Sequence, residues 1–140
     1  MALILDSSGL LAAIDDKQED HALTREYLDA VRDLLVISPF VLAELDYMVM
    51  TRLGQERELA LLEEVSRGAY HLEPFSSEDV SDAIEVIESY ADLGVGLADA
   101  SNVVLSRKYE TNDLLTLDER HFRTLRGCRD RPFRILPADA

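Results

Sequence analysis

Short segments rich in apolar residues alternate along the chain with longer stretches of helical periodicity. The short segments are residues 2–5, 34–37, 69–72, 114–117 and 133–136. Segments of this length, bounded by polar residues, are typical of strands buried on both faces of a sheet. Because the strands alternate with helices, the pattern indicates an α/β fold with a mainly parallel sheet.

Helices are predicted between and after these strands. Their expected ranges are 8–14, 21–33, 39–53, 55–67, a helix from Ser76 or Ser77 to about 91, 97–109, and a short helix near His121. Ser38 is expected to cap the helix that starts at Pro39, where the missing N–H is harmless. The chain has no repeat, low-complexity tract or linker, so residues 1–140 are predicted to form a single domain.

The composition favours a soluble cytoplasmic protein. The longest apolar run is far shorter than the roughly 18 residues that a membrane span requires. No basic region precedes the apolar N-terminus and no cleavage site follows it, so no signal peptide is expected. The single cysteine, Cys128, excludes an internal disulfide and a cysteine metal cluster.

The charge of the chain is strongly negative but unevenly distributed. A net charge of −14 argues against nucleic acid as a partner, because phosphates are normally bound by a basic face. The exception is a C-terminal arginine strip, which contains one acid, Asp130, and the residues Arg120, Arg123, Arg126, Arg129, Arg131 and Arg134. This strip is either a solvated surface or a source of phosphate contacts.

Two aspartates directly follow predicted strands. Asp6 comes after residues 2–5, and Asp118 comes after residues 114–117. The carboxyl ends of parallel strands share one edge of the sheet, and ligands of open α/β folds bind at that edge. Each aspartate has an alternative role as the N-cap of the next helix.

Two acids lie among apolar residues in the predicted helix 39–53. Their neighbours three and four positions away are Phe40, Val41, Tyr47 and Met48 for Glu44, and Leu42, Ala43, Val49 and Met50 for Asp46. A carboxylate in such surroundings has to be paired, metal-bound or protonated. Periodicity does not choose between Glu44 and Asp46, but at least one of them should face a polar site.

A further acid, Asp99, lies in the first turn of the predicted helix 97–109. Its small neighbours Ala98 and Ala100 permit close packing against a strand end, and Asn102 is one turn further on. The alternative is a favourable charge at a helix N-terminus. Asp92 is the competing acid, but it falls where the previous helix ends and is expected to be exposed.

Several carboxylates at one edge of a sheet imply a metal ion. The acids repel each other unless a cation holds them, and ligand sets made of oxygen select Mg²⁺ or Mn²⁺. Such ions typically act on phosphates, whose charge they neutralise while lowering the pKa of a bound water. An acidic metal site therefore reconciles the net charge of −14 with a polyanionic substrate.

Four segments together resemble the PIN-domain ribonucleases, specifically the VapC-type toxins of bacterial toxin–antitoxin (VapBC) systems. The segments are residues 3–8, 38–45, 97–100 and 114–118 with 121–122, so the resemblance covers nearly the whole chain. It implies a PIN-like fold with strand order 3-2-1-4-5 and a homodimer. It also implies a metal-dependent endoribonuclease that leaves a 5′-phosphate and is neutralised by a cognate VapB-type antitoxin.

The resemblance also implies roles for individual residues. The acidic quartet of the family maps onto Asp6, Glu44, Asp99 and Asp118 as catalytic residues and ligands of Mg²⁺ or Mn²⁺. This mapping prefers Glu44 to Asp46. The family has a serine or threonine near the fourth acid, and Thr116 fits that supporting role.

Two further residues and one alternative function complete the expectations. Ser7 is expected to cap the first helix or to contact a metal-bound water, and His121 lies close enough to Asp118 in sequence to meet the substrate. The alternative function is a catalytically silent PIN-fold module whose acidic pocket binds only a basic partner peptide. Cleavage of RNA that depends on Mn²⁺ distinguishes the enzyme from the silent module.

Overall fold

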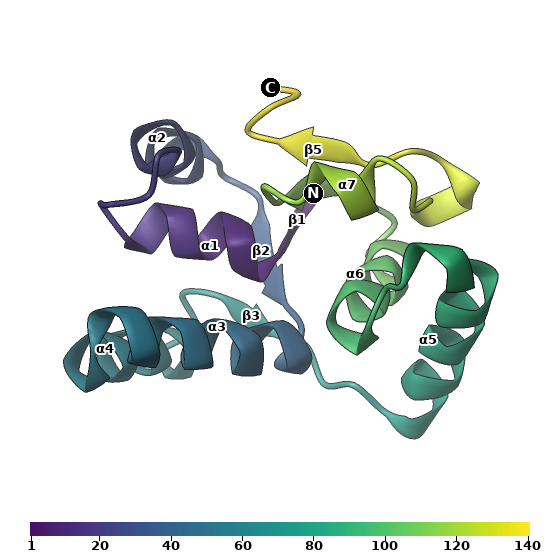
Figure 1. The fold of residues 1–140 in the computed structure, drawn as a ribbon, viewed down its shortest axis with the longest axis horizontal. Coiled ribbons are helices and arrows are strands. Elements are labelled where there is room, and N and C mark those ends of the chain that lie inside the picture. The colour runs from purple at the N-terminus through teal and green to yellow at the C-terminus, as the bar shows by residue number, and fades with distance from the viewer.

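The computed structural model describes residues 1–140 and contains a five-stranded parallel sheet in its centre (Figure 1). The strands are β1 (Ala2–Leu5), β2 (Leu34–Ile37), β3 (His71–Leu72), β4 (Asp113–Leu115) and β5 (Arg134–Leu136). Their order in the sheet is β3-β2-β1-β4-β5. The predicted α/β class, the parallel sheet and the strand order are therefore confirmed.

Helices cover both faces of this sheet. They are α1 (Ser7–Ile14), α2 (His21–Ala30), α3 (Pro39–Leu53), α4 (Gln55–Ser66), α5 (Ser77–Ser89), α6 (Leu97–Lys108) and α7 (Glu119–Phe122), with 3₁₀ turns at Ala91–Leu93 and Cys128–Asp130. Helices α1 to α4 lie on one side of the strands, and α5 and α6 lie on the other (Figure 1). No helix is both long and apolar enough to cross a membrane.

The central strand β1 is buried on both faces, as its apolar run predicts. Ile4 packs into the cluster that includes residues of α5 and α6, whereas Leu3 and Leu5 pack into the cluster formed with α1 to α4. All three side chains are completely buried. This alternation follows from the two-residue period of a strand, and it fixes which way the chain leaves the sheet at Asp6.

The expected caps of α3 and α5 are present. The Ser38 side chain accepts a hydrogen bond from the Phe40 N–H at 3.1 Å, and Pro39 is the first residue of α3. Ser76, rather than Ser77, caps α5, and it exchanges hydrogen bonds with Asp79 in a capping box.

Three predicted boundaries were wrong by two or three residues. Helix α2 ends at Ala30 rather than at residue 33, because Val31 is already extended and leads into β2. Strand β4 ends at Leu115 rather than at residue 117, because the chain turns after Thr116 and the Leu117 N–H bonds the Ser8 hydroxyl at 2.9 Å. Strand β3 is only His71–Leu72, since it lies at the edge of the sheet and pairs with β2 alone.

Gly9 sets how closely α1 approaches the sheet. A Cβ atom at this position would lie 2.7 Å from the Leu115 carbonyl oxygen, which belongs to β4 and cannot move away. We expect Gly9→Ala to lower the free energy of unfolding by about 2 kcal/mol or more, as overpacking against fixed atoms does. Urea denaturation monitored by circular dichroism measures the change.

The matched control for this substitution is Gly96→Ala. A Cβ atom at Gly96 has nothing within 4 Å, and the backbone there has φ −98°, which alanine adopts readily. Its unfolding free energy should stay close to that of the unmodified chain. Equal stability of the two variants would contradict the close approach of α1 to β4.

Candidate active site

The sheet has a topological switch point between β1 and β4. From β1 the chain goes to β2 on one side, and it later returns to β4 on the other side. Asp6 directly follows β1, and Thr116 directly follows β4. Both side chains therefore lie at the crevice where open α/β sheets bind their ligands.

Asp6 is held in place by three side chains from different parts of the fold. It receives hydrogen bonds from the Thr116 hydroxyl at 2.8 Å, the Asn102 amide at 3.0 Å and the Ser8 hydroxyl at 3.3 Å. Although Asp6 occupies the N-cap position of α1, its side chain makes no capping hydrogen bond. Its alternative interpretation as a helix cap is therefore wrong.

The environment of Asp6 opposes its negative charge. The residue is only 3% exposed. Mainly because of this burial, the pKa of Asp6 is raised to about 6. The hydrogen bond from Thr116 lowers the pKa, whereas the nearby Asp99 and Glu44 carboxylates raise it. A cation at this position would relieve both the burial cost and the repulsion.

Glu44 reaches the same place from α3. Its carboxylate accepts a hydrogen bond from the Ser7 hydroxyl. Ser7 is the first residue of α1 and not its cap, so the expectation that it caps the helix was wrong. The start of α3 is tied to α6 by a buried hydrogen bond of 2.7 Å between the hydroxyls of Ser101 and Ser38.

The structure separates Glu44 from Asp46, which periodicity did not. Glu44 is exposed and lines the pocket at the end of β1, whereas Asp46 does not line it. Asp46 instead approaches Glu58 of α4, and the neighbouring Asp46 carboxyl raises the pKa of Glu58. Among the apolar neighbours of Glu44, Val41 is buried in the core, Met48 lines the pocket beside the Glu44 carboxylate, and Tyr47 is exposed.

Asp99, Asp118 and His121 form a close group beside Asp6. The His121 Nδ1 atom lies 2.8 Å from an Asp99 oxygen and 3.2 Å from an Asp118 oxygen. One ligand atom from each of the three residues lies within 4.8 Å of the others. Burial raises the pKa of Asp99, whereas His121 lowers it. Asp118 also caps α7 by accepting the His121 N–H at 3.2 Å, so the cap weighed for it is confirmed, and its role in a ligand site stays a prediction.

These acids line one pocket of about 380 Å³. Its lining residues are Asp6, Ser7, Ser8, Leu11, Gln18, Glu44, Met48, Arg52, Asp99, Leu117, Asp118 and His121. All four acids that the sequence singled out are therefore brought together. Sequence reasoning missed Ser8 and Arg52. The position of Arg52 eight residues after Glu44 was a usable signal, since that spacing returns close to the same face of a helix.

The arginine strip does not line this pocket. Arg123 pairs with Glu119 and Asp139 at 2.8 and 2.7 Å. Arg134 lies 3.4 Å from Asp113, and Arg129 lies 3.9 Å from Glu110. These ion pairs lie at the exposed surface, so phosphate contacts by the strip stay a prediction, and such contacts would lie outside the lining of the acidic pocket.

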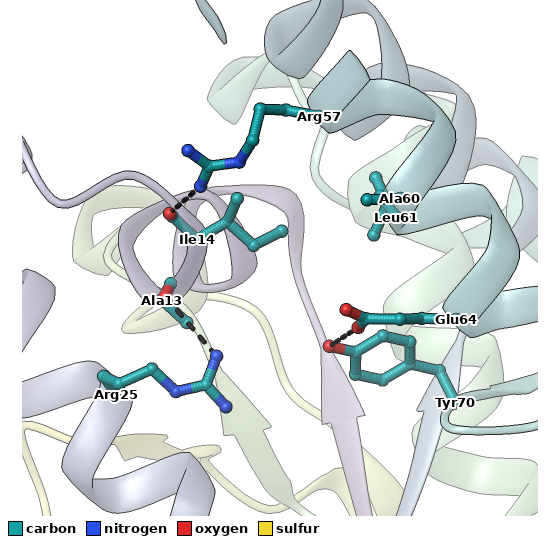
Figure 2. Close-up of a pocket in the computed structure, with 8 residues that line it drawn as sticks. All are labelled: Ala13, Ile14, Arg25, Arg57, Ala60, Leu61, Glu64 and Tyr70. Atoms are coloured by element: carbon teal, nitrogen blue, oxygen red, sulfur yellow. Dashed lines mark hydrogen bonds between the residues drawn. The ribbon is translucent and has the colours of Figure 1, made fainter. Parts of the chain in front are cut away.

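A second pocket lies at the other end of α1, and Figure 2 shows its eight lining residues. Arg57 of α4 donates a hydrogen bond to the Ile14 carbonyl at 2.6 Å, and Arg25 of α2 donates to the Ala13 carbonyl at 3.5 Å (Figure 2). Tyr70 donates to Glu64 at 3.2 Å. The two guanidiniums satisfy the last carbonyls of α1, so the pocket is a junction between three helices.

With this geometry the chain belongs to the PIN-domain family, whose model matches residues 3–127. Over 135 residues it is 44% identical to Ribonuclease VapC26 of Mycobacterium tuberculosis, covering 96% of this chain and 100% of that protein. The resemblance to VapC-type proteins in the sequence is thus confirmed.

Solved structures show the same fold. The toxin VapC20 of Mycobacterium tuberculosis, described as cleaving the sarcin–ricin loop, matches with a TM-score of 0.77 at 16% identity, over 83% of this chain and 89% of that chain. DNA-bound VapBC from Salmonella typhimurium matches with a TM-score of 0.63 at 25% identity, over 96% of each chain.

Proposed function

We propose that this chain is a VapC-type endoribonuclease toxin that hydrolyses RNA phosphodiester bonds in the cytoplasm with the help of Mg²⁺ or Mn²⁺. One observation carries the proposal: four carboxylates from β1, α3, α6 and the start of α7 line a single pocket at the switch point of the sheet. The 44% identity to a protein named as a ribonuclease supports the same activity.

The residues present fit a divalent cation. Asp6, Glu44, Asp99 and Asp118 supply hard oxygen donors, which Mg²⁺ and Mn²⁺ prefer. Burial raises the pKa of both Asp6 and Asp99, and neighbouring carboxylates add to the effect. Such a set of repelling acids is stabilised by a positive ion, so we assign these four residues as its ligands.

Hydrolysis adds water across the bond between phosphorus and the 3′ oxygen, leaving a 5′-phosphate and a 3′-hydroxyl. A cation held by these four acids would supply positive charge for the phosphate and would lower the pKa of a water. Glu44 is the most exposed of the four acids. It is thus the residue best placed to accept a proton from that water.

Four neighbouring side chains position the acids. Thr116 bonds Asp6 and also accepts the Asp118 N–H at 3.0 Å, so it links two of the acids through one hydroxyl. Ser7 orients Glu44. Asn102 fixes the second oxygen of Asp6, and His121 holds Asp99 and Asp118 together.

We infer the partners of the chain from the same comparisons and from its surface. The Salmonella typhimurium structure contains a VapBC pair, so we propose that a VapB-type antitoxin neutralises this chain. An acidic pocket suits a basic segment of that antitoxin.

We also propose a homodimer, for which the exposed Tyr47 and Met50 of α3 offer apolar surface. We take residues 1–140 as one domain, because β5 completes the sheet beyond residue 127.

The proposal is tested by the metal dependence of RNA cleavage. The purified chain should cut single-stranded RNA in the presence of Mn²⁺ or Mg²⁺, and EDTA should reduce the rate to background. Excess Mn²⁺ should restore the rate, and it should also raise the melting temperature, because it binds only the folded chain. Mapping of the 5′ ends identifies the products.

Two outcomes would contradict the proposal. Cleavage that persists in EDTA would remove the cation from the reaction. A folded chain that binds Mn²⁺ but cuts no RNA, while binding a basic peptide, would favour the catalytically silent module.

A further inference from the structure

The candidate active site continues along α3 beyond the four acids. Glu44, Met48 and Arg52 follow one another at intervals of four residues, so they form a stripe along one face of the helix. All three line the pocket. The α-carbons of Glu44 and Arg52 are about 12 Å apart along the helix axis, since each residue adds 1.5 Å.

Arg52 is the only arginine or lysine that lines this pocket. Its side chain is exposed and makes no hydrogen bond or ion pair within the chain, although its charge is near enough to Asp15 to help lower the pKa of that carboxyl. Other arginines of the same helical layer are engaged: Arg57 bonds the Ile14 carbonyl, and Arg67 pairs with Glu63 at 3.2 Å. Arg52 therefore has its full set of donors available to a ligand.

The neighbours of Arg52 fit a nucleic acid strand. Gln18 also lines the pocket, and its amide donates one hydrogen bond to Asp15 at 3.2 Å and has a second N–H that can donate to a ligand. Met48 lies between Glu44 and Arg52 on α3, and together with Leu11 it gives the pocket an apolar surface that suits the face of a base or a ribose. A negatively charged chain with a net charge of −14 also needs a local positive charge to hold RNA.

We propose that Arg52 binds a backbone phosphate of the RNA strand away from the phosphodiester that is cut. The proposal rests on the proposed ribonuclease function, and it assigns to this chain a substrate-binding position outside the acidic quartet. The α-carbon of Arg52 lies about two turns of α3 beyond that of Glu44, so we assign its guanidinium to a phosphate of the same strand next to the one held among the acids. The guanidinium is suited to this contact because it donates two parallel hydrogen bonds to phosphate oxygens.

The first test compares Arg52→Gln with the unmodified chain on a long RNA. We expect KM to rise at least tenfold while kcat changes much less, because the lost contact is made equally in the bound substrate and in the transition state. The dependence of log affinity on log salt should become shallower by about 0.7, the value for one phosphate of a single strand. The loss in kcat/KM should be larger for the long RNA than for a dinucleotide.

Two control variants separate binding from a structural role. Arg32→Gln removes another exposed, unpaired arginine, which lies before the amino end of β2 and so away from the carboxyl ends of the strands, and it should leave KM and the salt slope unchanged. Arg52→Lys keeps the charge but not the planar fork, so it should retain the salt slope and lose part of the affinity. A role limited to the last turn of α3 predicts a lower melting temperature and an unchanged KM.

RNA binding is measured in parallel by fluorescence anisotropy with a labelled single-stranded RNA. Equal KM, salt slope and affinity for Arg52→Gln and the unmodified chain would overturn the assignment of Arg52. Absence of cleavage by the unmodified chain would contradict the proposed function instead. In that case the anisotropy titration still decides on Arg52, because equal affinities of the two proteins overturn its assignment.

Discussion

Asp99→Asn should reduce RNA cleavage by at least about 100-fold while leaving the fold intact. Asp99 lies in the first turn of α6, and its oxygen lies 2.8 Å from His121. The substitution keeps the size of the side chain but removes a charge from the proposed ligand set, which weakens both cation binding and the catalysis that depends on it. Initial rates on a fluorogenic RNA measure the effect at saturating Mn²⁺.

The matched control for this substitution is Asp92→Asn. Asp92 is an exposed aspartate in the 3₁₀ turn that precedes α6, and it does not line the pocket. The Asp92→Asn variant changes the net charge by the same amount as Asp99→Asn. Because Asp92 lies outside the pocket, the cleavage rate of this variant should stay close to that of the unmodified chain. An Asp99→Asn variant that cuts RNA at the unmodified rate would remove Asp99 from the active site.

Asp6→Asn should stabilise the metal-free protein at pH 7 while abolishing cleavage. Burial raises the pKa of Asp6 from 3.8 to about 6, and this rise corresponds to roughly 3 kcal/mol of destabilisation when the group is charged. An asparagine can accept the Asn102 hydrogen bond through its oxygen and donate to the Thr116 and Ser8 hydroxyls. The variant therefore keeps the contacts of Asp6 and loses only its unfavourable charge.

The direction of the pH dependence follows from this raised pKa. Between pH 4 and pH 6 the folded chain holds the Asp6 proton more tightly than the unfolded chain does. The contribution of Asp6 to stability therefore declines as the pH rises through this range, and it stays low above pH 6. Arg123 lowers the pKa of Asp139 to about 2, so the stabilisation from Asp139 stays constant between pH 4 and pH 7 and is lost only at lower pH.

Urea denaturation in EDTA at pH 4, 5, 6 and 7 measures this effect. The difference in unfolding free energy between Asp6→Asn and the unmodified chain should grow with pH and level off above pH 6. Mn²⁺ should narrow the difference, since it stabilises only the chain that keeps the Asp6 charge. A constant difference across this pH range, or a less stable variant at pH 7, would show that the burial of Asp6 does not oppose its charge.

The sequence contained most of the information about the fold, because the strand and helix patterns are local. The apolar run Ala2–Leu5 and the cap at Ser38 each depend on neighbouring residues, and both are present in the structure. The predicted boundaries failed where the chain turns for tertiary reasons. The end of β4 is one such case, since a hydrogen bond from Leu117 to Ser8, more than a hundred residues earlier in the chain, fixes the turn.

The candidate site was only partly predictable, because some of its residues are placed by local features and others by tertiary packing. Asp6, Asp99 and Asp118 were found from their positions next to strands or at a helix start, which are local features. The sequence pattern alone left Glu44 and Asp46 equivalent, because both have apolar neighbours on the helix. The packing of α3 against α1 and α6 turns Glu44 into the pocket and Asp46 toward Glu58.

The amino-acid sequence was therefore sufficient for the parallel α/β fold, the strand order implied by family resemblance and the acids at the strand ends. Three-dimensional packing determined which acids share a pocket, which arginines pair with acids from other segments, and that Arg52 lines the pocket without a hydrogen bond or ion pair. The physical reason is that periodicity reports how a residue relates to its own helix or strand. Contacts between elements depend on how the elements pack, and these contacts set the burial and charge of each group.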